Sequence, residues 1–296
     1  MYSRALCGLA SLLLLATPPL CGDEPAMAPI WKLTDADSSV YLAGSVHLLR
    51  EKDMPLPAVF DRVYAGVEEL VFEIDMATLS EPDSARKMRA LGTLPDGGRL
   101  GDKLSTATMA RIGVYLKKRG IPAGVFDTLT PGMVYLTIGS LEAARSGAKP
   151  HLGLEMVYFE KSLEDGKPSR GLETVAFQMS RFNDFEPALL EKLISESIDE
   201  AEDSPETFDA IVAAWRSGDE EALTELIVDQ TEPNSQLREV LLTGRNRNWI
   251  PEIEKHLATD RDVMFLVGVG HLVGDDSVID LLREKGYEVM QLAKGE

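Results

Sequence analysis

Strand and helix patterns alternate at both ends of the chain, and this order constrains its fold more than any other feature. Near the beginning, short strand patterns over 31–33 and 39–43 precede a helix pattern over 57–67 and a buried strand over 69–74. Near the end, an apolar strand over 263–267 precedes a helix over 277–285 and a closing strand over 287–292. A strand–helix–strand order predicts parallel strands joined by right-handed crossovers. We therefore predict an α/β protein, with the strands at 39–43 and 69–74 as a parallel pair.

The middle of the chain, from about 80 to 240, has mainly helical patterns. The clearest lie over 104–119, 133–144 and 153–164, and a short strand is predicted over 169–173. The simplest arrangement joins both chain ends in one central, mostly parallel sheet, with the helical middle as an insertion or cap. We find no internal repeat and no low-complexity linker, so residues 23–296 are predicted to form a single domain.

Residues 1–22 have the pattern of a secretory signal peptide. Arg4 precedes an apolar run over 5–17, which is too short to span a bilayer, and two prolines follow it. We expect cleavage after Gly22 and a periplasmic or extracellular location. Two alternatives are a buried N-terminal helix and lipid anchoring at Cys21, although the residues before Cys21 make a poor lipoprotein motif.

Composition excludes several classes of protein. The two cysteines, Cys7 and Cys21, both lie in the signal segment, so the mature chain would have no disulfide, thiolate metal site or cysteine nucleophile. The chain has 30 Lys and Arg against 49 Asp and Glu, a net charge of −19, which disfavours nucleic acid and anionic lipid as partners. Outside the signal segment, no run of about 18 apolar residues predicts a membrane span.

Two similar motifs follow two of the predicted strands. Gly44-Ser45-Val46-His47 follows the strand over 39–43, and Gly268-Val269-Gly270-His271 follows the strand over 263–267. Both have the form G-x-x-H at the carboxyl end of an apolar strand, which is the edge where open α/β sheets bind ligands. The chain has only four histidines, and two of them occupy this same local position. The alternative, without a function, is that each histidine is a packing or capping residue beside a glycine turn.

Glu73 closes the strand over 69–74, and a carboxylate at the end of a buried strand needs a partner. Two imidazoles and a carboxylate at neighbouring strand ends suit a divalent transition metal held by His47, Glu73 and His271. They equally suit metal-free acid–base catalysis, in which Glu73 orients a histidine that activates water.

Several further segments stand in a characteristic order over about residues 30–292: Ile30–Lys32, Tyr41–His47, Glu73, Gly153–Glu155, Gly171–Thr174 with Gln178, Arg245–Asn246, and Val267–Gly274. In this order they resemble the TraB/PrgY/GumN family, which includes the Tiki metalloproteases. Glu155 stands where the family commonly has aspartate, which leaves its role open.

The resemblance implies an α/β fold shared with erythromycin-esterase-like and haem-binding ChaN-like proteins. It also implies a site built from His47, His271, Glu73 and Arg245 and, for the Tiki branch, divalent-metal-dependent peptide cleavage. We therefore expect an exported hydrolase that uses Mn²⁺, Co²⁺ or Zn²⁺ and acts on a peptide or small molecule. Arg245 would stabilise the substrate carbonyl or its oxyanion, and Glu173 would act as ligand, base or orienting group.

Three alternatives stay open. Glu173 and Arg245 could instead form a buried ion pair that holds the insertion to the sheet. The pocket could hold a metal, haem or peptide without turnover, which would make the chain a binding or regulatory protein. The chain could also be an inactive protein that acts through its surface alone.

Overall fold

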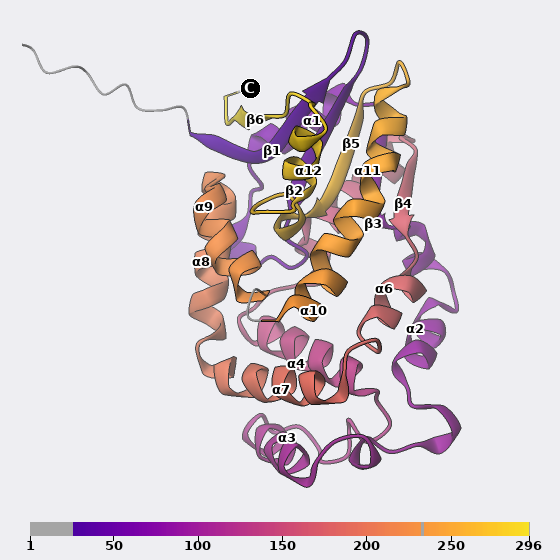
Figure 1. Cartoon of the computed structure of the whole chain (residues 1–296), viewed down its shortest axis with the longest axis vertical. Helices are drawn as coiled ribbons and strands as arrows, with labels where there is room; N and C mark the ends of the chain where they lie inside the picture. Colours follow the sequence, from indigo (N-terminus) through magenta and orange to yellow (C-terminus); the bar gives the residue numbers. More distant parts are fainter. Residues whose placement is uncertain (1–25, 232–233, 296) are drawn as a thin grey trace, which may run out of the picture.

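The computed structural model describes residues 26–231 and 234–295, in which one six-stranded sheet organises the α/β fold (Figure 1). The strand order is β4-β3-β5-β2-β1-β6. The predicted signal peptide over 1–22 lies outside the described residues. The strands are β1 (Met27–Thr34), β2 (Ser39–Ser45), β3 (Glu69–Ile74), β4 (Ser169–Glu173), β5 (Val263–Gly268) and β6 (Met290–Ala293).

The sheet is mostly parallel and both chain ends contribute to it, as predicted. β5 pairs in parallel with β2 and with β3, and β3 pairs in parallel with β4. β1 runs antiparallel to both β2 and β6. The prediction that β2 and β3 pair directly is wrong, because β5 lies between them. All six residues of β5 are buried, as expected of a central strand with both faces covered.

Two predicted strand boundaries change in the structure. β2 continues through Ser45, and β5 continues through Gly268, so each G-x-x-H motif begins within its strand. The closing strand begins at Met290 rather than at residue 287, because pairing with β1 at the sheet edge begins only at Met290.

Side chains cap the N-terminal ends of several helices. Ser105, Thr130, Thr174 and Ser277 each accept a bond from a backbone N–H in the first turn of the helix that follows, which satisfies a group that the helix leaves unpaired. The helices are α1 (Ala58–Gly66), α2 (Ser84–Gly92), α3 (Thr106–Lys118), α4 (Pro131–Arg145), α5 (Leu154–Asp165), α6 (Val175–Arg181), α7 (Pro187–Asp199), α8 (Ser204–Ser217), α9 (Glu220–Leu223), α10 (Ser235–Arg238), α11 (Gly244–Leu257) and α12 (Val278–Glu284).

Some helices of the middle segment pack against the sheet, and others form a separate group. α5 and α8 belong to the hydrophobic core around the sheet, to which they contribute Tyr158 and Trp215. α3, α4 and α7 have apolar clusters of their own and lie at the far end of the molecule (Figure 1). We call α2, α3, α4, α6 and α7 the cap. In the part of the chain that the structure describes, every helix is too short or too polar to cross a bilayer.

Candidate functional site

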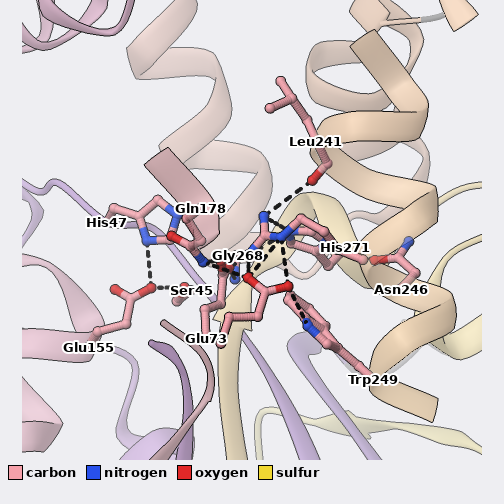
Figure 2. A network of polar contacts seen from close by, with 12 residues as sticks. Ser45, His47, Glu73, Glu155, Gln178, Leu241, Asn246, Trp249, Gly268 and His271 are labelled. Carbon is pink, nitrogen blue, oxygen red and sulfur yellow. Dashed lines mark hydrogen bonds and ion pairs between the residues drawn. The ribbon is translucent and has the colours of Figure 1, made fainter. Parts of the chain in front are cut away.

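Four parallel strands end at the same edge of the sheet and bring the predicted site residues together. Ser45 of β2 is in register with Gly268 of β5, and Ile74 of β3 is in register with Glu173 of β4. Figure 2 shows His47 and His271 on opposite sides of Glu73, near the end of β5. The sheet topology therefore gathers groups that are far apart in the sequence.

Glu73 lies at the centre of this group. Its Oε1 accepts the Gly268 N–H at 2.6 Å, and its Oε2 accepts from Arg245 Nη2 at 2.5 Å and from Gln178 Nε2 at 3.1 Å. Burial by itself would raise the pKa of this carboxyl. The positive charge of Arg245 is the largest of the effects that lower it, and together they hold the pKa of Glu73 well below its usual range. Glu73 is therefore an anion with both oxygens engaged.

His47 is the exposed member of the group, with 64% of its side chain accessible to solvent. Its Nδ1 lies 2.6 Å from Glu155 Oε1, an oxygen that also accepts from the Ser45 hydroxyl. The Glu155 charge raises the pKa of His47 to about 9. Because the carboxylate can only accept, it fixes the proton on Nδ1 and turns Nε2 toward Gly268 and Glu73.

Local sequence explains how Glu155 reaches His47. α5 begins directly after Gly153, and the Leu154 N–H donates to the Val46 carbonyl at 3.3 Å. A side chain at position 153 would collide with the His47 carbonyl, so glycine permits this close approach. Glu155, the residue that stands in place of the expected aspartate, is thus the carboxylate that orients the exposed imidazole.

His271 is buried and differs from His47 in its charge. Its Nδ1 lies 2.6 Å from Asn246 Oδ1, and Arg245 Nη1 donates to its Nε2 at 3.0 Å. The Asn246 amide nitrogen donates to the Asp276 carbonyl, which leaves its oxygen facing His271. Burial lowers the pKa of His271 to about 3, so this imidazole is neutral at ordinary pH with its proton on Nδ1.

Arg245 uses all five of its N–H groups within the protein. Nε and Nη2 donate to Glu173, Nη2 also donates to Glu73, and Nη1 donates to His271 and to the Leu241 carbonyl at 3.2 Å. Leu241 lies in a π-helical turn, Glu239–Thr243, directly before α11. A substrate oxygen could bind Arg245 only by displacing one of these acceptors, so the geometry favours a holding role over the expected oxyanion contact.

Glu173 completes the buried part of the group. Trp249 Nε1 donates to its Oε1 at 2.9 Å, and Gln178 Nε2 donates to its Oε2 at 3.0 Å. Trp249 lies one helical turn after Arg245, and its ring centroid is 4.4 Å from that of His271. The ion pair between Glu173 and Arg245, left open as an alternative from the sequence, is present and ties β4 to α11.

The predicted metal ligands do not form a metal site in this arrangement. Among the described residues, no group of three or more His, Cys, Asp or Glu side chains has a metal-holding geometry. Arg245 already binds the lone pairs of Glu73 Oε2 and His271 Nε2, whereas His47 Nε2 has no hydrogen-bond partner in the described part of the chain. The three-ligand set therefore does not fit a metal here, and dependence on a divalent metal stays a prediction.

Comparison with protein families gives a match that covers nearly all of the described chain. The pattern of the TraB/PrgY/gumN family matches residues 29–291, which include all the predicted site residues. The chain belongs to this family. Curated proteins and solved structures gave no match. Membership in the TraB/PrgY/gumN family confirms the resemblance found in the sequence.

Sequence reasoning gave no role in the site to four residues that shape it. Ser45, Gln178, Asn246 and Trp249 each bond to one of the predicted side chains. Asn246 and Trp249 share α11 with Arg245, and their spacing of one and four residues from it was a usable signal. Gln178 and Ser45 were visible only within the segments that resemble the family, because their contacts depend on how the fold places α6 and the end of β2.

Proposed function

We propose that the chain is an exported hydrolase that cleaves an acyl bond in a peptide, with His47 as its acid–base group. The observation that carries this proposal is the exposed imidazole of His47, held by Glu155 through Nδ1 with Nε2 left without a partner among the described residues. This is the geometry that a general base needs in order to reach water and substrate.

The proposed reaction uses water as the nucleophile. His47 Nε2 takes a proton from a water molecule as the water oxygen attacks the substrate carbonyl carbon. The same nitrogen then gives this proton to the departing amine as the carbon–nitrogen bond breaks, so His47 ends in its starting state. Glu155 stabilises the imidazolium between the two steps, a role that its 2.6 Å contact suits.

The buried residues position this exposed pair. Arg245 and the Gly268 N–H fix the Glu73 carboxylate beside His47, and Asn246 fixes the tautomer of His271. Because the pKa of His47 is about 9, its base form increases as the pH rises through the alkaline range. We expect the rate of cleavage to rise between pH 7 and pH 9 for this reason.

A peptide-library assay read by mass spectrometry tests the proposal. The purified protein is assayed with EDTA and separately with Mn²⁺, Co²⁺ or Zn²⁺, beside the variants His47→Ala and His151→Ala. We expect cleavage that His47→Ala lowers by about 10²–10⁴-fold. His151→Ala, in the short 3-10 helix Pro150–Leu152 before α5, changes an exposed residue and should retain full activity. Cleavage in EDTA favours the metal-free route, and cleavage only with an added ion favours the metal route predicted from the sequence.

Two outcomes would overturn the hydrolase proposal. Cleavage that is unchanged in His47→Ala would show that the site lies elsewhere. Retention of a metal, haem or peptide with no product under any condition would favour the alternative of a binding or regulatory protein.

A further inference from the structure

The cap contains an apolar cavity separate from the group around Glu73. It has a volume of about 440 Å³ and lies between α2, α4 and the segment leading into α7. Leu94, Leu104, Phe185 and Leu190 line it and are buried. Pockets that bind small molecules have this range of volume and this kind of lining, with a few polar groups that fix the ligand's orientation.

A second cavity, of about 210 Å³, shares a lining residue with the first one. Both are lined by Leu91 of α2, and the second continues between α2 and α6 to Thr174, the residue after Glu173. Met88 and Leu91 are 37% and 36% exposed, so these neighbouring side chains of α2 leave the smaller cavity partly open to solvent. We call the two cavities together the α2 groove. Figure 1 shows α2 beside α6 at the edge of the cap.

Each hydroxyl group that lines the α2 groove makes at least one local hydrogen bond. Thr78, Ser84 and Thr93 donate to backbone carbonyls of their own segments, and Thr130 and Thr174 accept from backbone N–H groups at the starts of α4 and α6. The Thr130 and Thr174 hydroxyl hydrogens and the Asn183 amide are the uncharged side-chain groups left to a peptide backbone, which has a donor and an acceptor at nearly every residue, so burying a peptide here would be costly. A hydrocarbon chain has no such requirement.

The larger cavity carries a positive charge. Lys103 lines it, is exposed, and makes no ion pair with any residue in the described ranges. Lys87, in the smaller cavity, is neutralised by Glu81 and Asp83. In a chain of net charge −19, an available lysine beside an apolar cavity complements a ligand with one negative group.

We propose that the α2 groove binds a fatty-acid-like ligand, with its hydrocarbon chain against Leu91 and its carboxylate toward Lys103. The site needs no turnover and does not depend on the proposed hydrolase. Since the groove reaches Thr174, beside the strand end that carries Glu173, a bound chain would lie next to the candidate site without contacting His47.

Titration calorimetry with dodecanoate, below the concentration at which it forms micelles, tests this inference in the full protein. We expect saturable binding that Leu91→Asp and Lys103→Glu each weaken by about tenfold. Their matched controls are Val114→Asp and Lys117→Glu on α3, away from the groove, where Val114 is 68% exposed. His47→Ala should bind dodecanoate as tightly as the natural chain does. Thermal melts of each variant separate loss of binding from loss of folding.

Two further ligands test the stated chemistry. Dodecylammonium, which reverses the charge, should bind more weakly than dodecanoate, and Lys103→Glu should reverse this preference. The tripeptide Leu-Phe-Leu should also bind more weakly. The inference fails if dodecanoate shows no saturable binding, if the α2 groove variants bind it unchanged, or if the tripeptide binds more tightly.

Discussion

Arg119 and Arg245 each form a network of ion pairs, and of these two networks the one around Arg245 has the features of a reactive site. Arg119, at the end of α3, donates to both oxygens of Glu142 in α4, and Glu142 also accepts from Tyr115 and Arg145. Arg245 likewise holds Glu73 and Glu173. Both networks join elements that are distant in the sequence.

The difference lies in where each network ends. The Arg119 network ends on Glu202 and on the Ala201 carbonyl, close to the end of α7. The Arg245 group ends on two imidazoles whose pKa values are shifted in opposite directions. That of His47 is raised to about 9, and that of His271 is lowered to about 3. A buried ion network is thus weak support for function by itself. Opposed pKa values beside an exposed imidazole are a stronger indication.

Arg245→Met should have the largest effect. It leaves Glu73 and Glu173 buried without their shared cation, so we expect the free energy of unfolding to fall by about 3–5 kcal/mol. Activity should fall at least ~10²-fold, because Glu73 and His271 lose the group that fixes them. Urea denaturation and the cleavage assay measure the two effects. Arg245→Lys keeps the charge with fewer donors, so its activity should lie between that of Arg245→Met and that of the natural chain. If Arg245→Met is as active as the natural chain, Arg245 has no part in the reaction.

Arg119→Met should reduce stability and leave the chemistry intact. Glu142 keeps Tyr115 and Arg145 but loses its bidentate partner, so we expect a loss of about 3 kcal/mol in urea denaturation. The turnover number of the folded variant should match that of the natural chain. A selective loss of turnover would show that the two networks do not differ as described.

Glu155→Gln should change the charge of His47 with little change in shape. Without the carboxylate charge, the pKa of His47 should fall from about 9 toward 6.5, and the pH profile of cleavage should move to lower pH. A histidine NMR titration in metal-free protein measures this shift, and His271 should remain neutral across the same range. An unchanged His47 titration would contradict the assigned role of Glu155.

The same pair gives a small dependence of stability on pH. Because the pKa of His47 is raised in the folded state, its contribution is fully present below pH 6.5 and is lost as the pH rises through about 9. The ring is exposed, so we expect less than about 1 kcal/mol.

Gly268→Ala should have the smallest effect. A Cβ at this position would lie 3.1 Å from Glu73 Oε1 and 3.3 Å from His47 Nε2, so both groups would have to shift by a few tenths of an ångström. We expect activity to fall by about tenfold. The control is Gly139→Ala in α4, where a Cβ meets nothing within 4 Å. Equal activity in both variants would argue against a reaction in this space.

The strand ends of the site could be predicted from sequence because parallel strands bring their carboxyl ends to one edge. Glu73 and the two G-x-x-H histidines needed only the alternation of strands and helices to be placed together. The order of the strands could not be obtained this way. Nothing in the local pattern of 263–267 indicates that β5 lies between β2 and β3.

The partners of the site residues were harder to predict, because they depend on how helices rotate against the sheet. Glu155 was visible only as a departure from a family pattern, and its contact with His47 depends on the close approach at Gly153. The saturation of Arg245 likewise depends on the π-helical turn that brings the Leu241 carbonyl to it. Such geometry comes from tertiary packing rather than local propensity.

The central place of β5 has a consequence for how the protein matures. Synthesis proceeds from the N-terminus, so β2 and β3 leave the ribosome long before the strand that must separate them. Contacts this distant in sequence form slowly, and unpaired strand edges are prone to aggregation in the meantime. A nascent chain that stops before Val263 would lack His271 and the Gly268 N–H, and would also leave two strand edges open. The proposed activity would thus be withheld until nearly the whole chain has been made, which would protect the synthesising cell from a prematurely active hydrolase.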